Sequence, residues 1–179
     1  MSDAPTDPLK AVKGGDDFLS KIRNSLAGFV GYFDRDQRRE ADRMLRETLA
    51  SKYEALWSRI SEVQRQLIAA KRLELVDDLE AAAIKLRAFV DRVRHASYGY
   101  AGFFDHVHID SQELATIYEY DYALLQNTDS LGRAIDNVEA SIGSDGEAAA
   151  IRNLTTLCQE AVDAFDHRND VILARGSTS

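Results

Sequence analysis

Proline is nearly absent from this 179-residue sequence, because its only two prolines, Pro5 and Pro8, both lie within the first ten residues. Everything from residue 9 onward therefore lacks the strongest helix breaker. Cysteine is scarcer still, and the single Cys158 excludes a disulfide framework and a cysteine-rich zinc site. Because Cys158 falls on an apolar stripe at helical spacing, we interpret it as a small, reduced core residue.

Long hydrophobic runs are also missing. No segment approaches the roughly 20 apolar residues that a membrane-spanning helix needs, and the first residues show no basic segment followed by an apolar one, as a secretory signal would. Hydrophobic residues make up 45% of the chain and charged residues 29%, which is typical of globular proteins. We therefore expect one globular domain located in the cytoplasm.

Basic residues are scarce in the second half of the chain. Residues 1–100 contain 18 basic and 16 acidic side chains, whereas residues 101–179 contain 4 and 14, and the net charge is -8. Nucleic-acid binding is not expected, because it needs a concentrated basic surface. Two interpretations stay open: the acidic half packs against the near-neutral half, or it receives a basic protein partner.

Helical periodicity is what the sequence has in abundance. Apolar residues recur every three or four positions, which predicts long helices with heptad-like seams. We therefore predict an all-α fold, an elongated antiparallel helical bundle with coiled-coil-like long helices and a short amphipathic amino-terminal helix. The expected organisation is a disordered tail at 1–15, one domain at 16–174 with helices at about 16–31, 36–71, 78–97, 111–142 and 146–173, and a loose tail at 175–179.

Three helix starts have the spacing of a capping box, in which two residues three positions apart bond each other's backbone. Asp110 with Glu113 marks the start of the helix at 111–142, and Ser144 with Glu147 marks the start of the last helix. Near residues 72–77, a slip in the phase of the apolar pattern and the capping-box spacing of Asp77 with Glu80 together predict a turn, with the next helix starting at residue 78. One continuous helix over 36–97, about 90 Å long, is the alternative there.

The segment 97–110 interrupts the helical period and is surrounded by aromatic residues. Tyrosines two positions apart cannot share one helix face, so some must meet the loop, another chain or solvent. Aromatic side chains are favoured at protein interfaces, and the alternative is a local core that holds the loop in place. The candidate interaction residues are Tyr98, Tyr100, Phe103, Phe104, Tyr118, Asp121, Tyr120 and Tyr122.

Asp121 belongs to this set because it stands in an apolar seam where leucine would be expected. A buried carboxylate needs a partner, and such a pair commonly fixes the register of a helix bundle. The candidate partners are Arg38, Arg39, Arg43, Arg92 and Arg94.

Asp105, His106, His108 and Asp110 are the candidate metal ligands, because imidazole and carboxylate groups suit zinc or iron. The alternative is that these residues cap the following helix and solvate its entry loop. The sequence contains no Glu-x-x-His pair, no phosphate-binding glycine motif and no hydrolase motif. We therefore expect no cofactor and no catalytic residues.

The amino-terminal helix carries an apolar stripe beside Lys21 and Arg23, which could meet anionic lipid. The stripe either covers the core of the bundle itself or binds a membrane surface, and the net charge opposes the second interpretation. Its members are Phe18, Ile22, Leu26, Phe29 and Phe33.

Two segments resemble motifs of an uncharacterised bacterial all-helical family: GYFDRDQRREADRMLRE at 31–47 and ASYGYAGFFD at 96–105. This resemblance implies an all-helical fold and carries no activity. The order of an amphipathic helix before a helical hairpin, over residues 18–97, is similar in architecture to phage-shock and ESCRT-III-like membrane-remodelling proteins. That resemblance implies peripheral contact with a membrane.

Taken together, these features predict a non-enzymatic helical scaffold or interaction protein that associates with itself or with a protein partner. One alternative is a peripheral membrane-binding protein of the membrane-stress type, acting through its amino-terminal helix. The other is a small-molecule or metal site at the aromatic loop 97–110.

Overall fold

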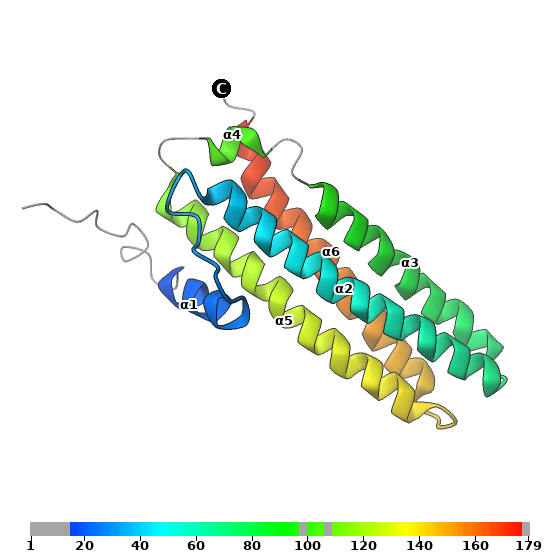
Figure 1. Ribbon diagram of the computed structural model, residues 1–179. Helices are drawn as coiled ribbons and strands as arrows, with labels where there is room; N and C mark the ends of the chain where they lie inside the picture. Colours follow the sequence, from blue (N-terminus) through cyan, green and yellow to red (C-terminus); the bar gives the residue numbers. More distant parts are fainter. Residues whose placement is uncertain (1–14, 97–99, 106–108, 177–179) are drawn as a thin grey trace, which may run out of the picture.

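The computed structural model describes residues 15–96, 100–105 and 109–176, and over these residues the chain is all-helical, without strands (Figure 1). The predicted fold class, all-α, is therefore confirmed. The helices are α1 (Gly15–Ser25), α2 (Arg38–Ala69), α3 (Leu73–His95), α4 (Ala101–Phe104), α5 (Ser111–Ser141) and α6 (Glu147–Gly176).

Four long helices lie side by side along the length of the molecule, and α1 lies along the outside of α5 (Figure 1). Helix α2 packs on α3 and α5 packs on α6, while α3 also contacts α6 and α2 also contacts α5. Helices α3 and α5 therefore occupy opposite corners, so the chain crosses one end of the bundle between them. The short helix α4 lies on this crossing and packs against α6.

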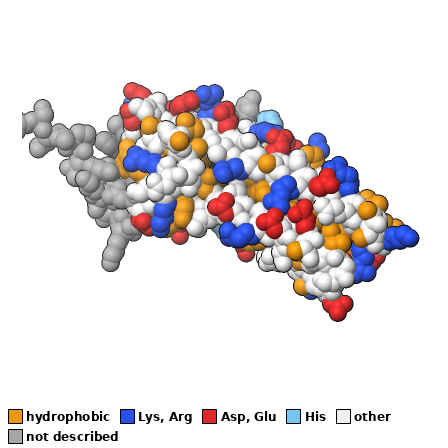
Figure 2. Space-filling model, turned by 60° about the horizontal axis from the view of Figure 1, so that its bottom comes forward, with side chains coloured by type: hydrophobic (Ala, Val, Ile, Leu, Met, Phe, Trp, Pro, Cys, Tyr) orange, Lys and Arg blue, Asp and Glu red, His pale blue; other side chains and the backbone are white. Residues whose placement is uncertain are grey.

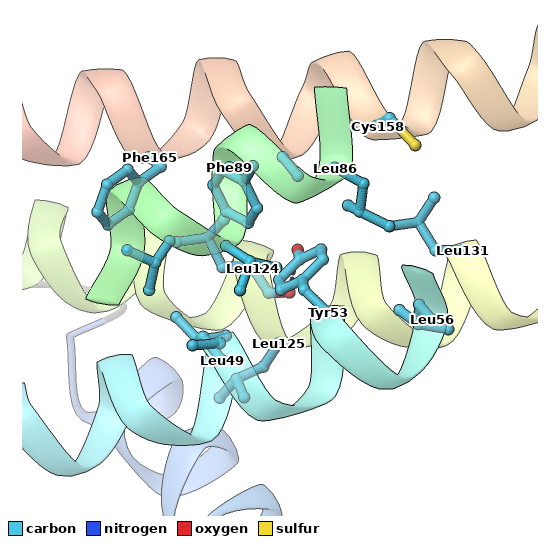
Figure 3. Close-up of a cluster of buried hydrophobic side chains, with 14 of the residues drawn as sticks. Leu49, Tyr53, Leu56, Leu86, Phe89, Leu124, Leu125, Leu131, Cys158 and Phe165 are labelled. Carbon is cyan, nitrogen blue, oxygen red and sulfur yellow. Dashed lines mark hydrogen bonds between the residues drawn. The ribbon is translucent and has the colours of Figure 1, made fainter. Parts of the chain in front are cut away.

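The middle of the bundle is an apolar core built around three aromatic rings (Figure 3). The ring of Phe89 in α3 lies edge-on to Tyr53 in α2, with centroids 4.7 Å apart, and to Phe165 in α6, with centroids 5.6 Å apart. Cys158 is fully buried beside them, and burial raises the pKa of its thiol to about 12. Burial makes Cys158 a core residue. A thiol with such a pKa is not a nucleophile near neutral pH.

The turn between the first two long helices lies at residues 70–72, earlier than the predicted 72–77. Lys71 adopts φ 60° there, and the N–H of Arg72 donates to the carbonyl of Leu67 at 2.9 Å. This left-handed closure of a helix is usually made by glycine or asparagine. Because lysine makes it here, the turn has no local signal in the sequence.

Replacing Lys71 with glycine is expected to raise the free energy of unfolding by about 0.5–1 kcal/mol, because only glycine adopts a left-handed conformation without a steric penalty. Urea unfolding followed by circular dichroism measures the change. Ala81→Gly, at an exposed position inside α3, is the control and is expected to lower stability by about 1 kcal/mol. A destabilised Lys71→Gly protein would contradict the prediction.

The amino-terminal helix ends at Ser25, six residues before the predicted end at residue 31. Gly28 and Gly31 both have left-handed backbones, with φ of 85° and 89°. At Gly31 a Cβ atom would lie 2.7 Å from the hydroxyl oxygen of Tyr118, so only glycine fits. The residues after α1 therefore fold back over α5 and carry Tyr32 into the interior.

The three predicted capping boxes have different outcomes. The one at Asp77 and Glu80 is wrong, because α3 already begins at Leu73 and both residues lie inside it. At α5 the box is formed: Asp110 accepts from the N–H of Gln112 at 2.6 Å, and Glu113 accepts from the N–H of Asp110 at 3.3 Å. At α6, Glu147 instead accepts hydrogen bonds from the N–H of Gly143 and from Arg72, whose Nε is 2.8 Å away. The hydrogen bonds from Arg72 and then from Gly143 lower the pKa of Glu147.

The stability contributed by Glu147 is expected to depend on pH. Its pKa is lowered on folding from an ordinary value of 4.5, so the contribution is complete above that value and is lost as the pH falls through the folded pKa. The stability difference between the wild type and Glu147→Gln should therefore be larger near neutral pH than under acid conditions. Urea unfolding at the two pH values tests this, with the exposed Glu160→Gln as the control. An equal difference at both pH values would refute the linkage.

Candidate functional site

At the end of the bundle near α4, the core contains charged residues instead of apolar ones. Arg168 in α6 is 0% exposed, and its Nε donates to Oδ1 of Asp121 in α5 at 2.5 Å. Its Nη2 donates to Oδ1 of Asp42 in α2 at 2.7 Å and to the hydroxyl of Tyr32 at 3.2 Å. The Tyr32 hydroxyl donates in turn to Oδ2 of Asp121 at 2.7 Å. One guanidinium thus joins α2, α5, α6 and the segment after α1.

A second buried arginine extends this arrangement to α3. Arg46 donates from Nε to Oδ2 of Asp42 at 2.7 Å, and from Nη1 to the carbonyl of Val93 at 3.3 Å, in the last turn of α3. We call Tyr32, Asp42, Arg46, Asp121 and Arg168 the buried cluster. It satisfies terminal carbonyl groups of α3 that have no partner within that helix.

The electrostatics of the buried cluster keep Arg168 charged and Tyr32 neutral. Burial acts to lower the pKa of Arg168, but the carboxylates of Asp121 and Asp42 outweigh it and raise that pKa well above its ordinary value. Burial, and then the charge of Asp121, raises the pKa of Tyr32 well above its ordinary value, so its hydroxyl stays a donor. Burial also raises the pKa of Asp121, against the opposing effects of Arg168 and Tyr32. The cluster therefore connects α2, α5, α6 and the segment after α1 through buried charged groups.

Tyr100, just before α4, lies against both buried arginines. The guanidinium carbons of Arg46 and Arg168 are 5.9 Å and 6.0 Å from its ring centroid, within the range of cation–π contacts. Its hydroxyl donates to Oδ1 of Asn169 in α6. Within the described part of the chain, Nη1 of Arg168 is buried without a hydrogen-bond partner.

An open pocket of about 560 Å³ lies on the outer side of Tyr100. This volume is within the range of small-molecule sites. Arginine side chains predominate in its lining, beside two carboxylates and two aromatic rings. The lining residues are Arg39, Asp42, Arg43, Arg46, Glu47, Arg94, Tyr100 and Phe104. Such a surface can donate several hydrogen bonds to an anion and can pack against a flat apolar group.

The predicted aromatic patch faces inward in the structure. Tyr100, Phe103, Phe104 and Tyr118 are each at most 4% exposed. The ring of Tyr118 stacks on Tyr32 at 5.1 Å, and its hydroxyl accepts from the N–H of Tyr32 at 2.6 Å. This is the local-core arrangement that the sequence left open, and Tyr98 lies outside the described residues.

The three tyrosines of α5 meet three different neighbours, as the helix geometry requires. Tyr118 faces the segment that follows α1, Tyr122 packs on Phe18 of α1 with centroids 5.9 Å apart, and Tyr120 stacks on His167 of α6 at 5.9 Å. All three therefore find partners within the chain.

Asp121 is buried and paired, but the five predicted partners were wrong. Its partner is Arg168, which follows Phe165 by three positions and precedes Ile172 by four, and so occupies a seam position of α6. Asp42 likewise precedes Leu45 by three positions. Charged residues at seam positions are the signal that could have found the cluster. The five arginines have other acceptors: Arg38 the carbonyl of Tyr32, Arg39 Asp105, Arg43 Glu40, Arg92 Asp166 and Arg94 Glu54.

The apolar stripe of the amino-terminal helix packs against the bundle. Ile22, Leu26 and Phe29 are 0%, 8% and 2% exposed, and Phe18 and Phe33 are half-buried against the same core. Membrane binding by this stripe stays a prediction, and it would require α1 to leave α5. Within the described ranges, no helix has both the length and the apolar character needed to cross a membrane.

The predicted metal ligands lie only in part within the described residues. Asp105 is paired with Arg39 and Asp110 caps α5, whereas His106 and His108 fall outside the description. Over residues 15–96, 100–105 and 109–176, no three histidine, cysteine or acidic side chains are placed to hold a metal ion together.

Comparison of the chain with protein-family models, curated proteins and solved structures finds no match. The resemblances to a bacterial helical family and to the phage-shock architecture therefore stay predictions.

Proposed function

We propose that this protein is a non-enzymatic helical interaction protein that binds a second copy of itself through the outer face of the α2–α3 hairpin. The observation that carries this proposal is the exposure of large apolar side chains on that hairpin. Ile68 is 52% exposed, Leu73 61% and Ile84 60%. Apolar residues that gather on one exposed face are typical of interaction sites.

These side chains lie on one face of the hairpin. Nε2 of Gln64 in α2 donates to Oε2 of Glu80 in α3 at 2.5 Å, so these two residues face each other across the boundary between the helices. Ile68 lies one helical turn from Gln64 toward the turn at 70–72, and Ile84 lies one helical turn from Glu80 in the opposite direction, each on the same face as its neighbour. We call the following residues the α2–α3 face: Trp57, Gln64, Ile68, Leu73, Glu80, Ile84 and Arg87. The guanidinium carbon of Arg87 lies 5.1 Å from the ring centroid of Trp57, which continues the same surface.

The balance of charge favours a second copy as the occupant. Residues 38–95 contain 13 basic and 10 acidic side chains, so this hairpin does not strongly repel its own copy. Residues 111–176 contain 4 basic and 12 acidic side chains, so two such hairpins would repel each other. In Figure 2, basic and acidic side chains alternate over the face that is shown, with hydrophobic side chains between them.

The remaining parts of this proposal concern packing and location. Within each copy we propose an antiparallel, coiled-coil-like bundle, which the contacts of α2 with α3 and of α5 with α6 support. The cytoplasm is the proposed location, supported by a single cysteine that is buried as a thiol.

Light scattering coupled to size-exclusion chromatography tests the association. We expect a mass that rises to that of a dimer with protein concentration, and an at least roughly tenfold weaker association for Ile84→Glu and Leu73→Glu, since each would place a charge in a desolvated contact. Val30→Glu is the matched control, because Val30 is 48% exposed but belongs to the segment that connects α1 to α2 and not to the α2–α3 face. A monomeric mass at every concentration, or an association that both hairpin variants leave unchanged, would overturn the proposal.

A further inference from the structure

We infer that the pocket beside Tyr100 is a binding site for a phosphate monoester that carries a flat apolar substituent. This site is separate from the proposed self-association, because its lining residues are not those of the α2–α3 face. The inference rests on the charge of the lining, the exposure of the arginines at its rim and the rigidity of its floor.

The lining has an excess of positive charge in a chain that is acidic as a whole. Four arginines and only two carboxylates, Asp42 and Glu47, line the pocket, while the net charge of the chain is -8. This excess of two positive charges among the lining residues matches in magnitude the two negative charges of a phosphate monoester dianion. Several guanidinium groups can bond such a phosphate together, because each has a planar fork of donors that matches its oxygens.

The arginines at the rim can exchange their present partners for a ligand. The side chains of Arg39, Arg43 and Arg94 are 60%, 57% and 41% exposed. Their carboxylate partners, Asp105, Glu40 and Glu54, are about half exposed as well. Exposed ion pairs of this kind contribute little to stability, so a dianion can replace them at low cost.

The floor of the pocket is held in place from behind. The side chain of Arg46 is only 7% exposed and is fixed by Asp42 and by the end of α3. The ring of Tyr100 lies between this arginine and the apolar ring of Phe104, with ring centroids of Tyr100 and Phe104 6.0 Å apart. The guanidinium carbon of Arg168 lies 6.0 Å from the ring centroid of Tyr100, which supports this ring from the interior. A rigid floor with an aromatic wall favours a ligand with a flat group, since little ordering is needed on binding.

Isothermal titration calorimetry of the full chain with phenyl phosphate tests the inference. We expect phenyl phosphate to bind, inorganic phosphate to bind about tenfold more weakly, and benzyl alcohol not to bind, because only the first combines the dianion with the ring. The affinity should fall as sodium chloride is added, since the rim is exposed to screening. Absence of phenyl phosphate binding, or equal binding of benzyl alcohol, would overturn the inference.

Two rim variants locate the binding in this pocket. Arg43→Gln and Arg94→Gln are each expected to weaken phenyl phosphate binding about tenfold, while the circular dichroism spectrum stays unchanged because both residues are exposed. Arg65→Gln is the matched control: Arg65 is on α2, is 70% exposed and pairs with Glu62, but does not line the pocket. If all three variants bind like the wild type, phenyl phosphate binds elsewhere and the inference fails.

A vesicle cosedimentation experiment distinguishes a lipid headgroup from a soluble ester as the source of the phosphate. Cosedimentation with phosphatidylcholine vesicles that contain phosphatidic acid, lost in Arg43→Gln, would support a lipid headgroup in this pocket. Phenyl phosphate binding without cosedimentation would support a soluble ester. Ile84→Glu should bind phenyl phosphate as the wild type does. If binding is lost in this variant, the site depends on the dimer and not on this pocket alone, which would contradict the inference.

Discussion

Replacing Arg168 with methionine is expected to lower the free energy of unfolding by about 3–5 kcal/mol, because it leaves two buried carboxylates without their shared cation. Asp121 is 0% exposed and Asp42 2% exposed, so water cannot take the place of the guanidinium. Asp42 keeps Arg46 as a partner, whereas among the described side chains Asp121 keeps only the hydroxyl of Tyr32. The loss should therefore arise mainly at Asp121. Urea unfolding followed by circular dichroism measures it.

A double-mutant cycle separates the charge from the packing. Arg168→Met with Asp121→Leu is expected to be clearly less destabilised than the sum of the two single variants, because the pair replaces an ion pair with apolar groups. Tyr32→Phe removes one hydroxyl and should cost about 1–3 kcal/mol, since it removes the donor to Oδ2 of the buried Asp121. An Arg168→Met protein as stable as the wild type would show that the cluster does not hold the helices together.

Phe89→Ala is expected to destabilise the protein by about 3–5 kcal/mol, the usual cost of deleting a buried aromatic side chain. Phe89 is 1% exposed, and its ring lies between Tyr53 and Phe165, so that its removal opens a cavity bordered by three helices (Figure 3). The surrounding helices are held at both ends by the turn at Lys71 and by the buried cluster, so they have little freedom to close the cavity. Chemical denaturation measures the loss.

The control for this substitution is Phe89→Leu, which keeps most of the apolar volume but loses the edge-on ring contacts. We expect it to cost roughly half as much as the alanine variant. A loss smaller than about 1 kcal/mol for Phe89→Ala would mean that the core has collapsed around the site, and that the aromatic contacts contribute little.

The long helices could be predicted from the sequence because burial imposes a period on it. The seam of α5, from Leu114 to Val138, continues without a break, and Asp110 with Glu113 marks its start. The turn at Lys71 could not be predicted in place, since a lysine in the left-handed region leaves no local signal. The path of the chain after α1 is of the same kind: glycine is required at position 31 by the hydroxyl of Tyr118, which lies far away in the sequence.

The candidate site was predictable only in its parts. The sequence marks Asp121 as a seam residue in need of a cation, but helical spacing states which face a residue occupies and not which helix that face meets. The sequence marks Arg168 only as a charged residue in the apolar seam between Phe165 and Ile172. The pocket depends on the crossing between α3 and α5, which brings Tyr100 and Phe104 over the start of α2, and no one-dimensional pattern encodes that crossing.

The crossing also separates early from late events in folding. Each hairpin joins neighbouring helices through a short turn, so it can close through contacts that are local in the chain. The contact of Arg168 with Tyr32, by contrast, spans 136 positions and exists only once both hairpins and the amino-terminal segment have docked. We expect contacts of this kind to form late, so substitutions at Arg168 should mainly accelerate unfolding and leave the refolding rate nearly unchanged. On this expectation, the buried cluster mainly sets the unfolding rate, and therefore the lifetime of the folded protein, and has little influence on the folding rate.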